Sequence, residues 1–413
     1  MKSPLVISNQ CLSLSSANGR TIYNFVKLFD CCTVSNFYIS GSVEECINAS
    51  FFQLSDKDAL KNIITFGAKG GLEVINSKEC ENNQNNGYKA KKRVIKYILR
   101  DIVWRLALRF NHKLSNWVDK IKPDGIIIFV ADSSFLNDYA RRISKKKKIP
   151  LITYSTENYC LKNYDYIEKK IKRGIIFRVF QKRLLNSTKK IYIHAIQNFL
   201  STEDLCELFK NTFKLNNINY LYQCSYSCVF KTSNKPIRKL IYAGNLELNR
   251  IDSLIELANV VKTINCECII NVYSQTLSLS DEKKLESAHN INYCGFVPYN
   301  ELQTKIDESD MILHCESFDN YNKIDLEYAF STKISDSLMC GKPFFIYAPD
   351  NFSETKFMRQ INDNFVASSA DELLYKIRRI LNGDYIYSIN HDIIKNYFSP
   401  IISRNKLIKI INK

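Results

Sequence analysis

The residues best suited to chemistry in this sequence surround a short apolar segment in its last quarter. A predicted strand, Met311–Cys315, is followed directly by Glu316, which places that carboxylate at the carboxyl edge of a sheet. A predicted helix, Thr332–Cys340, comes later, and Ser331 is placed to cap it. Lys333 lies in the first turn of this helix, where a cation opposes the helix dipole and is poor for stability. An anion bound at this helix end would remove that conflict.

Asp336 follows Lys333 by three residues, so the two side chains lie on one face of the predicted helix. A carboxylate at this position could accept hydrogen bonds from the hydroxyl groups of a ribose while the lysine holds a diphosphate. An ordinary surface ion pair between Lys333 and Asp336 is the alternative interpretation of the same spacing.

Glycines are scarce, 12 in 413 residues, and two of them stand between a predicted strand and a predicted helix. Gly19 has this place in the first half of the chain, and Gly244 has it in the second. A glycine there lets the backbone approach a ligand, and the following helix presents its first N–H groups to an anion. Arg250, at the start of the helix after Gly244, suits a phosphate group. The alternatives are an ordinary turn for each glycine and a solvated surface side chain for the arginine.

Short apolar segments alternate with amphipathic helical segments along the chain, the pattern expected of parallel sheets with crossover helices. The predicted strands are residues 5–8, 124–130, 151–154 and 190–195 in the first half, and 239–243, 267–273, 291–293, 311–315 and 343–347 in the second. The motifs G-x-G-x-x-G and G-x4-G-K-[ST] are absent, which excludes the standard dinucleotide and P-loop classes. We expect an α/β protein with two Rossmann-like domains, residues 1–228 and 229–390, whose parallel sheets face a central cleft.

Several of these residues occur in an order that resembles the GT-B glycosyltransferases. The resemblance is carried by Gly244 with Arg250, the segment INYCGFV with Gly295, then Glu316, the segment STKI with Asp336, and finally Gly341 and Pro343. The chain is most similar to retaining, family 4-like bacterial enzymes that build capsule, O-antigen or other surface polysaccharides. The similarity covers residues 239–366, and the first half resembles these enzymes only in architecture.

The resemblance implies that the second domain binds a nucleoside diphosphate-sugar and the first domain binds the acceptor, with Gly19 on the acceptor side. It also implies that Asp336 contacts the nucleotide ribose and that Arg250 and Lys333 hold the diphosphate. The remaining residues of the implied donor site are Gly244, Gly295, Glu316 and Ser331. A final segment, residues 391–413, would pack back on the first domain.

Retaining members often carry a Glu-x7-Glu pair that ends at the position of Asp336. The eighth residue upstream is Tyr328 here, with Glu327 beside it, so retention and inversion both stay open.

The implied reaction needs few protein groups. Departure of the sugar leaves a nucleoside diphosphate, which a cationic clamp stabilises without an obligatory metal or cofactor. An inverting enzyme would add a general base, for which Asp132 and Glu157, after two strands of the first half, are the candidates. Structural carboxylates in polar loops are the alternative. His194 and His314 lie in predicted apolar strands and are interpreted as core histidines.

The composition excludes other classes of protein. No apolar run approaches the roughly 20 residues of a membrane-spanning helix, and the first residues lack a signal-peptide pattern. The 14 cysteines lack the paired spacing of zinc sites, and no nucleic-acid-binding signature is present. We therefore expect a cytoplasmic protein with no metal, no cofactor and no nucleic-acid partner.

The excess of basic over acidic residues is confined to the first part of the chain. The net charge is +16, but residues 1–230 hold 36 basic and 19 acidic side chains, and the rest holds 22 and 23. Residues 89–113 combine nine basic side chains with apolar residues at helical spacing, and residues 169–183 repeat this chemistry. A basic amphipathic helix suits an anionic bilayer. A core-packed helix with a solvated basic face is the alternative.

The sequence therefore favours a glycosyltransferase that lies on the inner face of the cell membrane. It would move a sugar from a nucleoside diphosphate-sugar to a lipid-linked saccharide during surface polysaccharide assembly. The alternatives are a non-catalytic scaffold that binds nucleotide sugar or membrane, and a sugar-nucleotide epimerase of the same fold.

Overall fold

The computed structural model of the chain describes residues 1–14, 16–44, 47–67, 70–74, 93–226, 236–275 and 277–411. The chain divides into two compact units, Met1–Gln223 with Arg404–Lys413, and Cys224–Ser403. The predicted boundary between residues 228 and 229 lies outside the described residues. Within the first unit, Arg404 Nη2 lies 2.6 Å from Asp30 Oδ2, which attaches the last part of the chain to the helix-to-strand turn after its first helix.

The first unit is built on an eight-stranded sheet with the strand order β4-β3-β2-β1-β5-β6-β7-β8. Neighbouring strands are parallel, as predicted, except that the edge strand β4 is antiparallel to β3. The central strands β1, β5 and β6 are mostly apolar and almost entirely buried, as expected of strands covered on both faces. The strands are β1 (Pro4–Gln10), β2 (Ser35–Ser40), β3 (Ser50–Gln53), β4 (Leu72–Val74), β5 (Gly125–Phe129), β6 (Leu151–Ser155), β7 (Gln197–Leu200) and β8 (Ile218–Tyr220).

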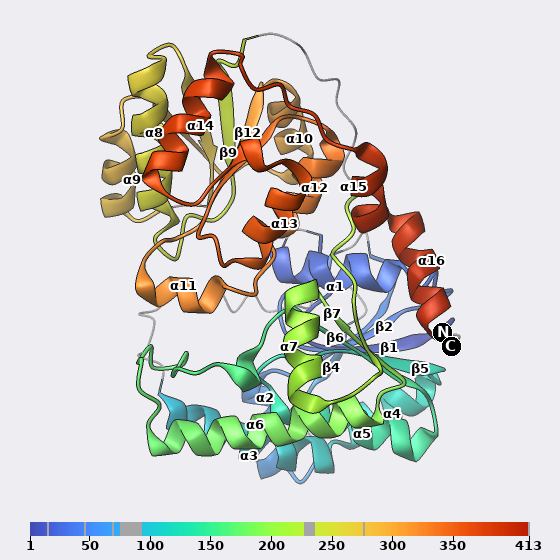
Figure 1. Cartoon of the computed structure of the whole chain (residues 1–413). Coiled ribbons are helices and arrows are strands. Elements are labelled where there is room, and N and C mark those ends of the chain that lie inside the picture. The colour runs from blue at the N-terminus through green and yellow to red at the C-terminus, as the bar shows by residue number, and fades with distance from the viewer. Residues whose placement is uncertain are drawn as a thin grey trace. The chain divides into compact units, whose positions relative to one another are not determined.

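Helices α3, α5 and α6 of the first unit pack side by side (Figure 1). The helices of this unit are α1 (Ala17–Lys27), α2 (Asp56–Ile64), α3 (Val94–Phe110), α4 (His112–Ile121), α5 (Ser134–Lys147), α6 (Ile175–His194) and α7 (Glu203–Phe213), with a 3-10 turn at Tyr159–Leu161. The predicted strand at residues 190–195 is wrong, because these residues form the last turns of α6 and the strand begins at Gln197. Ile191 continues the helical spacing of buried residues that includes Leu184 and Thr188, which explains why the helix extends this far.

The second unit contains a six-stranded sheet with the order β11-β10-β9-β12-β13-β14, and all of its strand pairs are parallel. The strands are β9 (Lys239–Ala243), β10 (Ile269–Tyr273), β11 (Ile291–Gly295), β12 (Met311–Cys315), β13 (Phe344–Tyr347) and β14 (Val366–Ala367). The bounds of β9 and β12 are those predicted from the sequence. These two strands are neighbours, so the loops after them lie at the same edge of the sheet.

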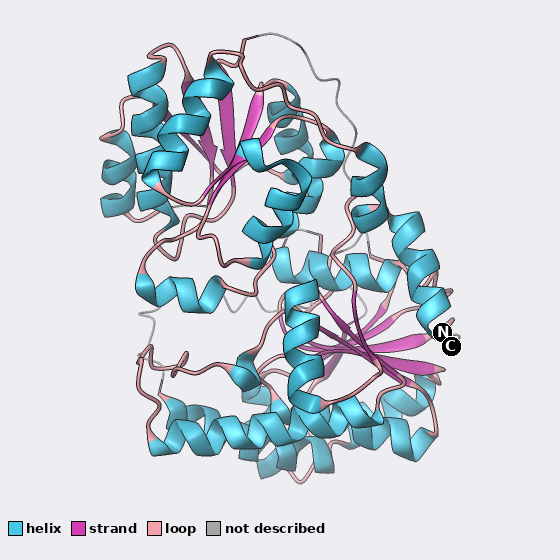
Figure 2. Ribbon diagram, viewed as in Figure 1, coloured by secondary structure: helices cyan, strands magenta, loops and turns pink. Residues whose placement is uncertain are grey.

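Helices cover both faces of this second sheet (Figure 2). The helices after β9 are α8 (Arg250–Ile264), α9 (Leu279–Glu286), α10 (Tyr299–Asp307), α11 (Asn320–Leu326), α12 (Thr332–Cys340), α13 (Ser353–Asn362), α14 (Ala370–Leu381), α15 (His391–Phe398) and α16 (Pro400–Ile411). The core between the sheet and α8 and α14 includes Leu240, Leu254, Leu313 and Ile377, all nearly inaccessible to solvent. This core fixes the strand ends at which the candidate site lies.

None of the helices formed by the described residues combines the length and the apolar character that spanning a lipid bilayer requires.

Candidate functional site

The predicted donor-site residues of the second unit lie along the carboxyl edge of its sheet. Gly295 is the last residue of β11, Gly244 follows β9, and Glu316 follows β12. Gly295 has a φ of +72°, a conformation that glycine adopts without strain, and its carbonyl accepts a hydrogen bond from Ser274 N at 3.0 Å. The sheet order therefore brings together segments that are far apart in the sequence.

Gly244 is needed for packing against Lys333. A Cβ built on Gly244 would overlap the Nζ atom of Lys333, which reaches it from the first turn of α12. The same Nζ lies 5.3 Å from the centre of the Tyr242 ring, which favours a cation on its face. The sequence predicted space for a ligand at Gly244, and the structure places the lysine's ammonium group in that space.

Lys333 pairs with no carboxylate among the residues that the structure describes. The alternative of a surface ion pair with Asp336 is therefore not what the structure shows. Burial and the charge of Arg250 lower the pKa of Lys333 to about 8. A positively charged group held in this way lowers its free energy by binding an anion.

Arg250 begins α8 and forms a buried ion pair with Glu316. Arg250 Nε lies 2.7 Å from Glu316 Oε2, and the two side chains are 13% and 3% exposed. Burial would raise the pKa of Glu316, but the hydrogen bond from His314 and the charge of Arg250 lower it to about 2. The loop before Arg250 holds Leu248 and Asn249 at φ values of 62° and 60°, a region that non-glycine residues seldom occupy. The local backbone is thus strained where Arg250 is presented.

His314 and Glu354 extend this ion pair into the interior. His314 Nε2 lies 3.3 Å from Glu316 Oε1 and 3.1 Å from Glu354 Oε1, and all three residues are buried. One imidazole nitrogen and one carboxylate oxygen from each glutamate lie within 4.8 Å of one another, a spacing that could hold a metal ion. Because the guanidinium of Arg250 already pairs with Glu316, we interpret these residues as a chain of ion pairs.

Ser331 and Asp336 flank Lys333 on α12. Ser331 caps the helix as predicted, and its side chain accepts a hydrogen bond from Lys333 N at 3.4 Å. Ser331 N in turn donates to Glu354 Oε2 at 3.4 Å. Asp336 is half-buried and accepts a hydrogen bond from Ser225 Oγ at 2.6 Å.

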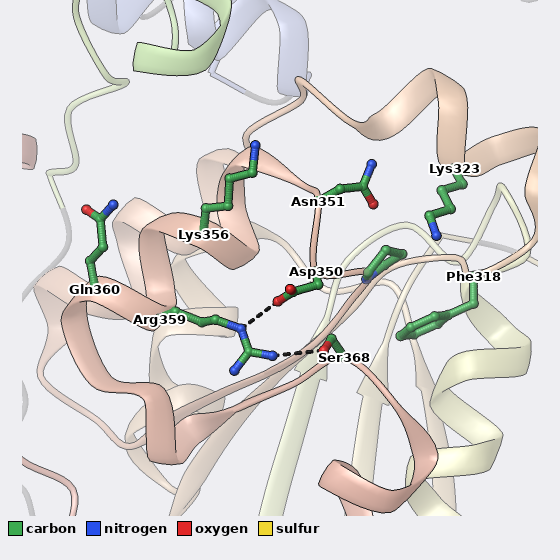
Figure 3. A pocket seen from close by; sticks show the side chains of 9 residues that line it. Phe318, Lys323, Asp350, Asn351, Lys356, Arg359, Gln360 and Ser368 are labelled. Carbon is green, nitrogen blue, oxygen red and sulfur yellow. Dashed lines mark hydrogen bonds and ion pairs between the residues drawn. The ribbon is translucent and has the colours of Figure 1, made fainter.

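A hollow of about 820 Å³ lies at the same edge of the sheet, around the loops after β12 and β13. Phe318 follows Glu316 by two residues and packs on Tyr347, with ring centres 4.5 Å apart. Figure 3 shows Arg359 turned toward Asp350 and Ser368, with which it bonds at 2.6 and 2.8 Å, while Lys323 and Asn351 lie on the other side. The lining residues are Phe318, Lys323, Pro349, Asp350, Asn351, Lys356, Arg359, Gln360 and Ser368. An aromatic face with amide and charged groups suits a polar ligand such as a sugar.

Gly19, the predicted acceptor-side glycine of the first unit, has no open space beside it. Gly19 is buried in the first turns of α1, where an added Cβ would lie 2.5 Å from Ser13 Cβ and from Ser16 Oγ. The space expected for a ligand at Gly19 is thus filled by the chain itself, and the glycine is required for this packing.

Asp132 and Glu157 follow the neighbouring strands β5 and β6, so both lie at the carboxyl edge of the first sheet. Glu157 is 31% exposed, and its Oε2 lies 3.8 Å from Lys162 Nζ. Lys162 is itself buried, with the rings of Tyr159, Tyr164 and Tyr166 centred 4.9, 5.7 and 5.7 Å from its Nζ. This enclosed lysine was not among the predicted site residues.

The two histidines also differ from prediction. His194 ends α6 rather than lying in a strand, and its Nε2 is 2.9 Å from Ser144 Oγ. His314 is buried in β12 as predicted, but its partners are two carboxylates that sequence spacing does not reveal. Glu354, from α13, was not among the predicted site residues.

The chain has the fold of the GT-B glycosyltransferases, as comparison with solved structures shows. No protein-family model matches the sequence, and no curated protein sequence matches it.

Three structures illustrate the likeness. The lipopolysaccharide outer core galactosyltransferase WaaB aligns over 99% of both chains with a TM-score of 0.56 and 11% identity. TarM aligns over 100% of this chain and 99% of its own, with a TM-score of 0.60 and 11% identity. The Anabaena protein Alr3699/HepE, in complex with UDP and glucose, aligns over 100% of both chains with a TM-score of 0.58 and 11% identity. At these identities the likeness concerns the fold, and the predicted fold class is confirmed.

Proposed function

We propose that this chain is a glycosyltransferase that takes its sugar from a nucleoside diphosphate-sugar. The observation that carries the proposal is the ammonium group of Lys333, which lies against Gly244 at the carboxyl edge of a GT-B sheet. It is half-buried, faces the Tyr242 ring and pairs with no carboxylate of the described residues. Arg250 is near enough to lower its pKa. Lys333 and Arg250 thus provide two adjacent cations, of which Arg250 has a carboxylate partner and Lys333 has none among the described residues, and this arrangement favours an anionic ligand.

The chemistry follows from this placement of charge. When the bond between the anomeric carbon and the leaving phosphate oxygen breaks, its electron pair stays on the diphosphate. Lys333 and Arg250 stabilise this growing charge in a site that excludes much of the solvent. Asp336 accepts hydrogen bonds from the ribose, and Gly244, Gly295, Glu316 and Ser331 shape the donor site. This proposal requires no metal or cofactor, and EDTA is expected to leave transfer unchanged.

Glu157 and Asp132 are the proposed groups for the acceptor side. A carboxylate there would take the proton of the attacking hydroxyl in an inverting reaction. Glu157 is the better candidate because it is 31% exposed and its Oε2 lies 3.8 Å from Lys162 Nζ, a buried cation that holds the carboxylate in place.

Two of the similar structures support the class of donor. The Anabaena protein is in complex with UDP and glucose, and a structure of S. aureus TarM contains UDP. By analogy we propose a nucleotide-sugar donor for this chain.

We also propose that the acceptor is a lipid-linked saccharide reached at an anionic membrane surface, as in assembly of a surface polysaccharide. The support is an exposed apolar stripe on α3, in which five residues at helical spacing are each 41–55% exposed: Ile95, Leu99, Ile102, Leu106 and Phe110. The opposite face of α3 buries Trp104 and Leu108. An exposed apolar face with basic neighbours, among them Arg93, Lys96 and Arg109, suits an anionic bilayer better than water. Lys89, Lys91 and Lys92 of the predicted basic helix lie outside the described residues.

The residues before and within the first turns of α6 also combine exposed apolar side chains with basic ones. Ile171, Ile175 and Val179 are 74%, 81% and 58% exposed, among the basic residues of 169–182. Val94 N at the start of α3 donates to Glu168 Oε1 at 3.2 Å, so this segment adjoins the beginning of α3. The two segments therefore belong to one region of the first unit.

The test is a thermal-shift panel of nucleoside diphosphates and nucleotide sugars, followed by transfer of labelled sugar in the presence of a membrane extract. At least one nucleoside diphosphate should raise the melting temperature of the wild type and of Lys262→Met, a control at an exposed lysine of α8. Lys333→Met should lose that stabilisation. Absence of stabilisation in the wild type, or its persistence in Lys333→Met, contradicts the proposal.

A further inference from the structure

A chain of buried charged groups connects the two helices that carry the cations of the candidate site. From α8, Arg250 contacts Glu316; Glu316 contacts His314; and His314 contacts Glu354 of α13. Glu354 then accepts a hydrogen bond from Ser331 N, at the start of the helix that carries Lys333. His314, predicted as a core histidine, is buried and lies at the centre of this chain.

The geometry requires a proton on Nε2 of His314. Both of its neighbours at this atom are carboxylate oxygens, which only accept hydrogen bonds. Two buried carboxylates so close together repel each other unless a positive charge lies between them. Burial alone would lower the pKa of His314, but Glu354 and Glu316 outweigh this and raise it above the usual value.

The charged groups around His314 come from every element packed against it. Glu316 follows its own strand, Glu354 comes from α13, and Lys333 comes from α12, with Arg250 of α8 beyond Glu316. On another side lies the apolar ring of Phe344 in β13, whose centre is 6.3 Å from that of the imidazole. With the imidazole protonated, three positive and two negative charges leave the site at +1; with the imidazole neutral, the site has no net charge.

We propose that His314 is a positioning residue whose imidazolium sets the net charge of the diphosphate site and holds Glu316 and Glu354 in place. This inference rests on the proposed donor function of that site. Donor affinity then falls as His314 loses its proton, and a second fall accompanies deprotonation of Lys333. His314 acts through Glu316 and Arg250 and need not touch the donor.

The test is calorimetric titration between about pH 5.5 and 8.5 with UDP-glucose and GDP-mannose, whose diphosphates carry no group that titrates in this range. The variant His314→Gln keeps a hydrogen-bond donor but not the charge. We expect it to bind the donor about tenfold more weakly than wild type at the acidic end. The two affinities should converge as the pH rises and the wild-type imidazole becomes neutral. A merely structural role would instead give curves that stay parallel.

Glu354→Gln provides an independent measurement should His314→Gln fail to fold. Removing this carboxylate while keeping an acceptor lowers the pKa of His314, so the wild-type loss of affinity should move to lower pH by about one unit. His194→Gln, at a histidine of the other unit, is the matched control and should follow the wild-type curve.

The outcomes separate the two proposals. Binding by the wild type with parallel curves for His314→Gln, or with an unshifted curve for Glu354→Gln, overturns the role of His314 and leaves the donor site standing. If neither these two donors nor any other nucleotide sugar of the thermal-shift panel binds the wild type at any pH, the proposed function fails and this inference with it.

Discussion

The ammonium nitrogen of Lys333 occupies the space that a side chain at position 244 would need. The two residues come from the end of β9 and the first turn of α12, so their contact depends on the assembled sheet edge. Gly244 therefore leaves room for the ammonium group of Lys333, in addition to forming the turn after β9.

Gly244→Ala is expected to weaken donor binding by about tenfold or more while changing stability little. The new Cβ overlaps the flexible end of a lysine side chain, which moves aside at low cost, but its ammonium then leaves the anion site. Calorimetric titration with the donor nucleotide measures the effect. Gly174→Ala is the control, because nothing lies within 4 Å of a Cβ there and its φ is −66°. Unchanged affinity in Gly244→Ala would show that the position of Lys333 is unimportant.

Lys333→Met is expected to make the ligand-free protein more stable and unable to bind the donor. The pKa of Lys333 is about 8 in the folded protein and higher when unfolded, so the unfolded chain binds more protons between these values. The cost of the buried charge is thus fully present below pH 8 and is relieved as the pH rises above it. Removing about 1 kcal/mol of this cost would raise the melting temperature by ~2–4 °C for a unit of this size.

Melting curves of the wild type and Lys333→Met should accordingly differ most near pH 7 and approach each other toward pH 10. Lys262→Met should match the wild type throughout. A less stable Lys333→Met at neutral pH would mean that the ammonium has a partner that stabilises it.

Arg250→Met is expected to destabilise the protein by about 3–5 kcal/mol, because it leaves Glu316 buried without its guanidinium. Arg250→Met with Glu316→Gln should recover most of this loss, since no unpaired charge remains. Denaturant unfolding at pH 7 measures both. Recovery of stability without recovery of donor binding is the expected result for the double variant. A double variant as unstable as the single one would show that packing of Arg250, not its charge, is what matters.

Asp336→Ala is expected to weaken UDP binding while leaving the affinity for inorganic pyrophosphate unchanged. The proposed partner of this carboxylate is the ribose, which pyrophosphate lacks, whereas Lys333→Met should weaken both ligands. Ser225→Ala removes the hydrogen bond that holds the Asp336 carboxylate. This variant tests whether UDP binding depends on the orientation of the carboxylate as well as on its presence. Equal losses for UDP and pyrophosphate in Asp336→Ala would assign the residue to the diphosphate instead.

The sequence predicted much of the second unit because its signals are local. The apolar runs of β9 and β12 and the cap at Ser331 lie within single elements, and their observed bounds agree with prediction. The positions of Gly244 and Glu316 at one sheet edge follow from the rule for parallel strands.

What the sequence could not provide are contacts between distant elements. Nothing near His314 in the chain reveals Glu354, which is 40 residues away on helix α13. The misassigned strand at residues 190–195 has a related cause. Its β-branched and aromatic residues have strand propensity, but Ile191 and Tyr192 are buried by tertiary packing as part of α6. Tertiary contacts outweigh a local preference that is worth well under ~1 kcal/mol per residue.

Leu99→Glu combined with Ile102→Glu is expected to abolish binding to anionic vesicles without unfolding the protein. Both residues are exposed on α3, 55% and 42%, so the new charges remain solvated when the protein is free, but they oppose contact with an anionic, apolar surface. Co-sedimentation with vesicles containing phosphatidylglycerol measures this binding, and it should decrease for the wild type as salt is raised. Leu279→Glu is the control, since this leucine is 78% exposed on α9 of the other unit. Wild-type binding to neutral vesicles alone, or undiminished binding by the double variant, would remove α3 as the membrane contact.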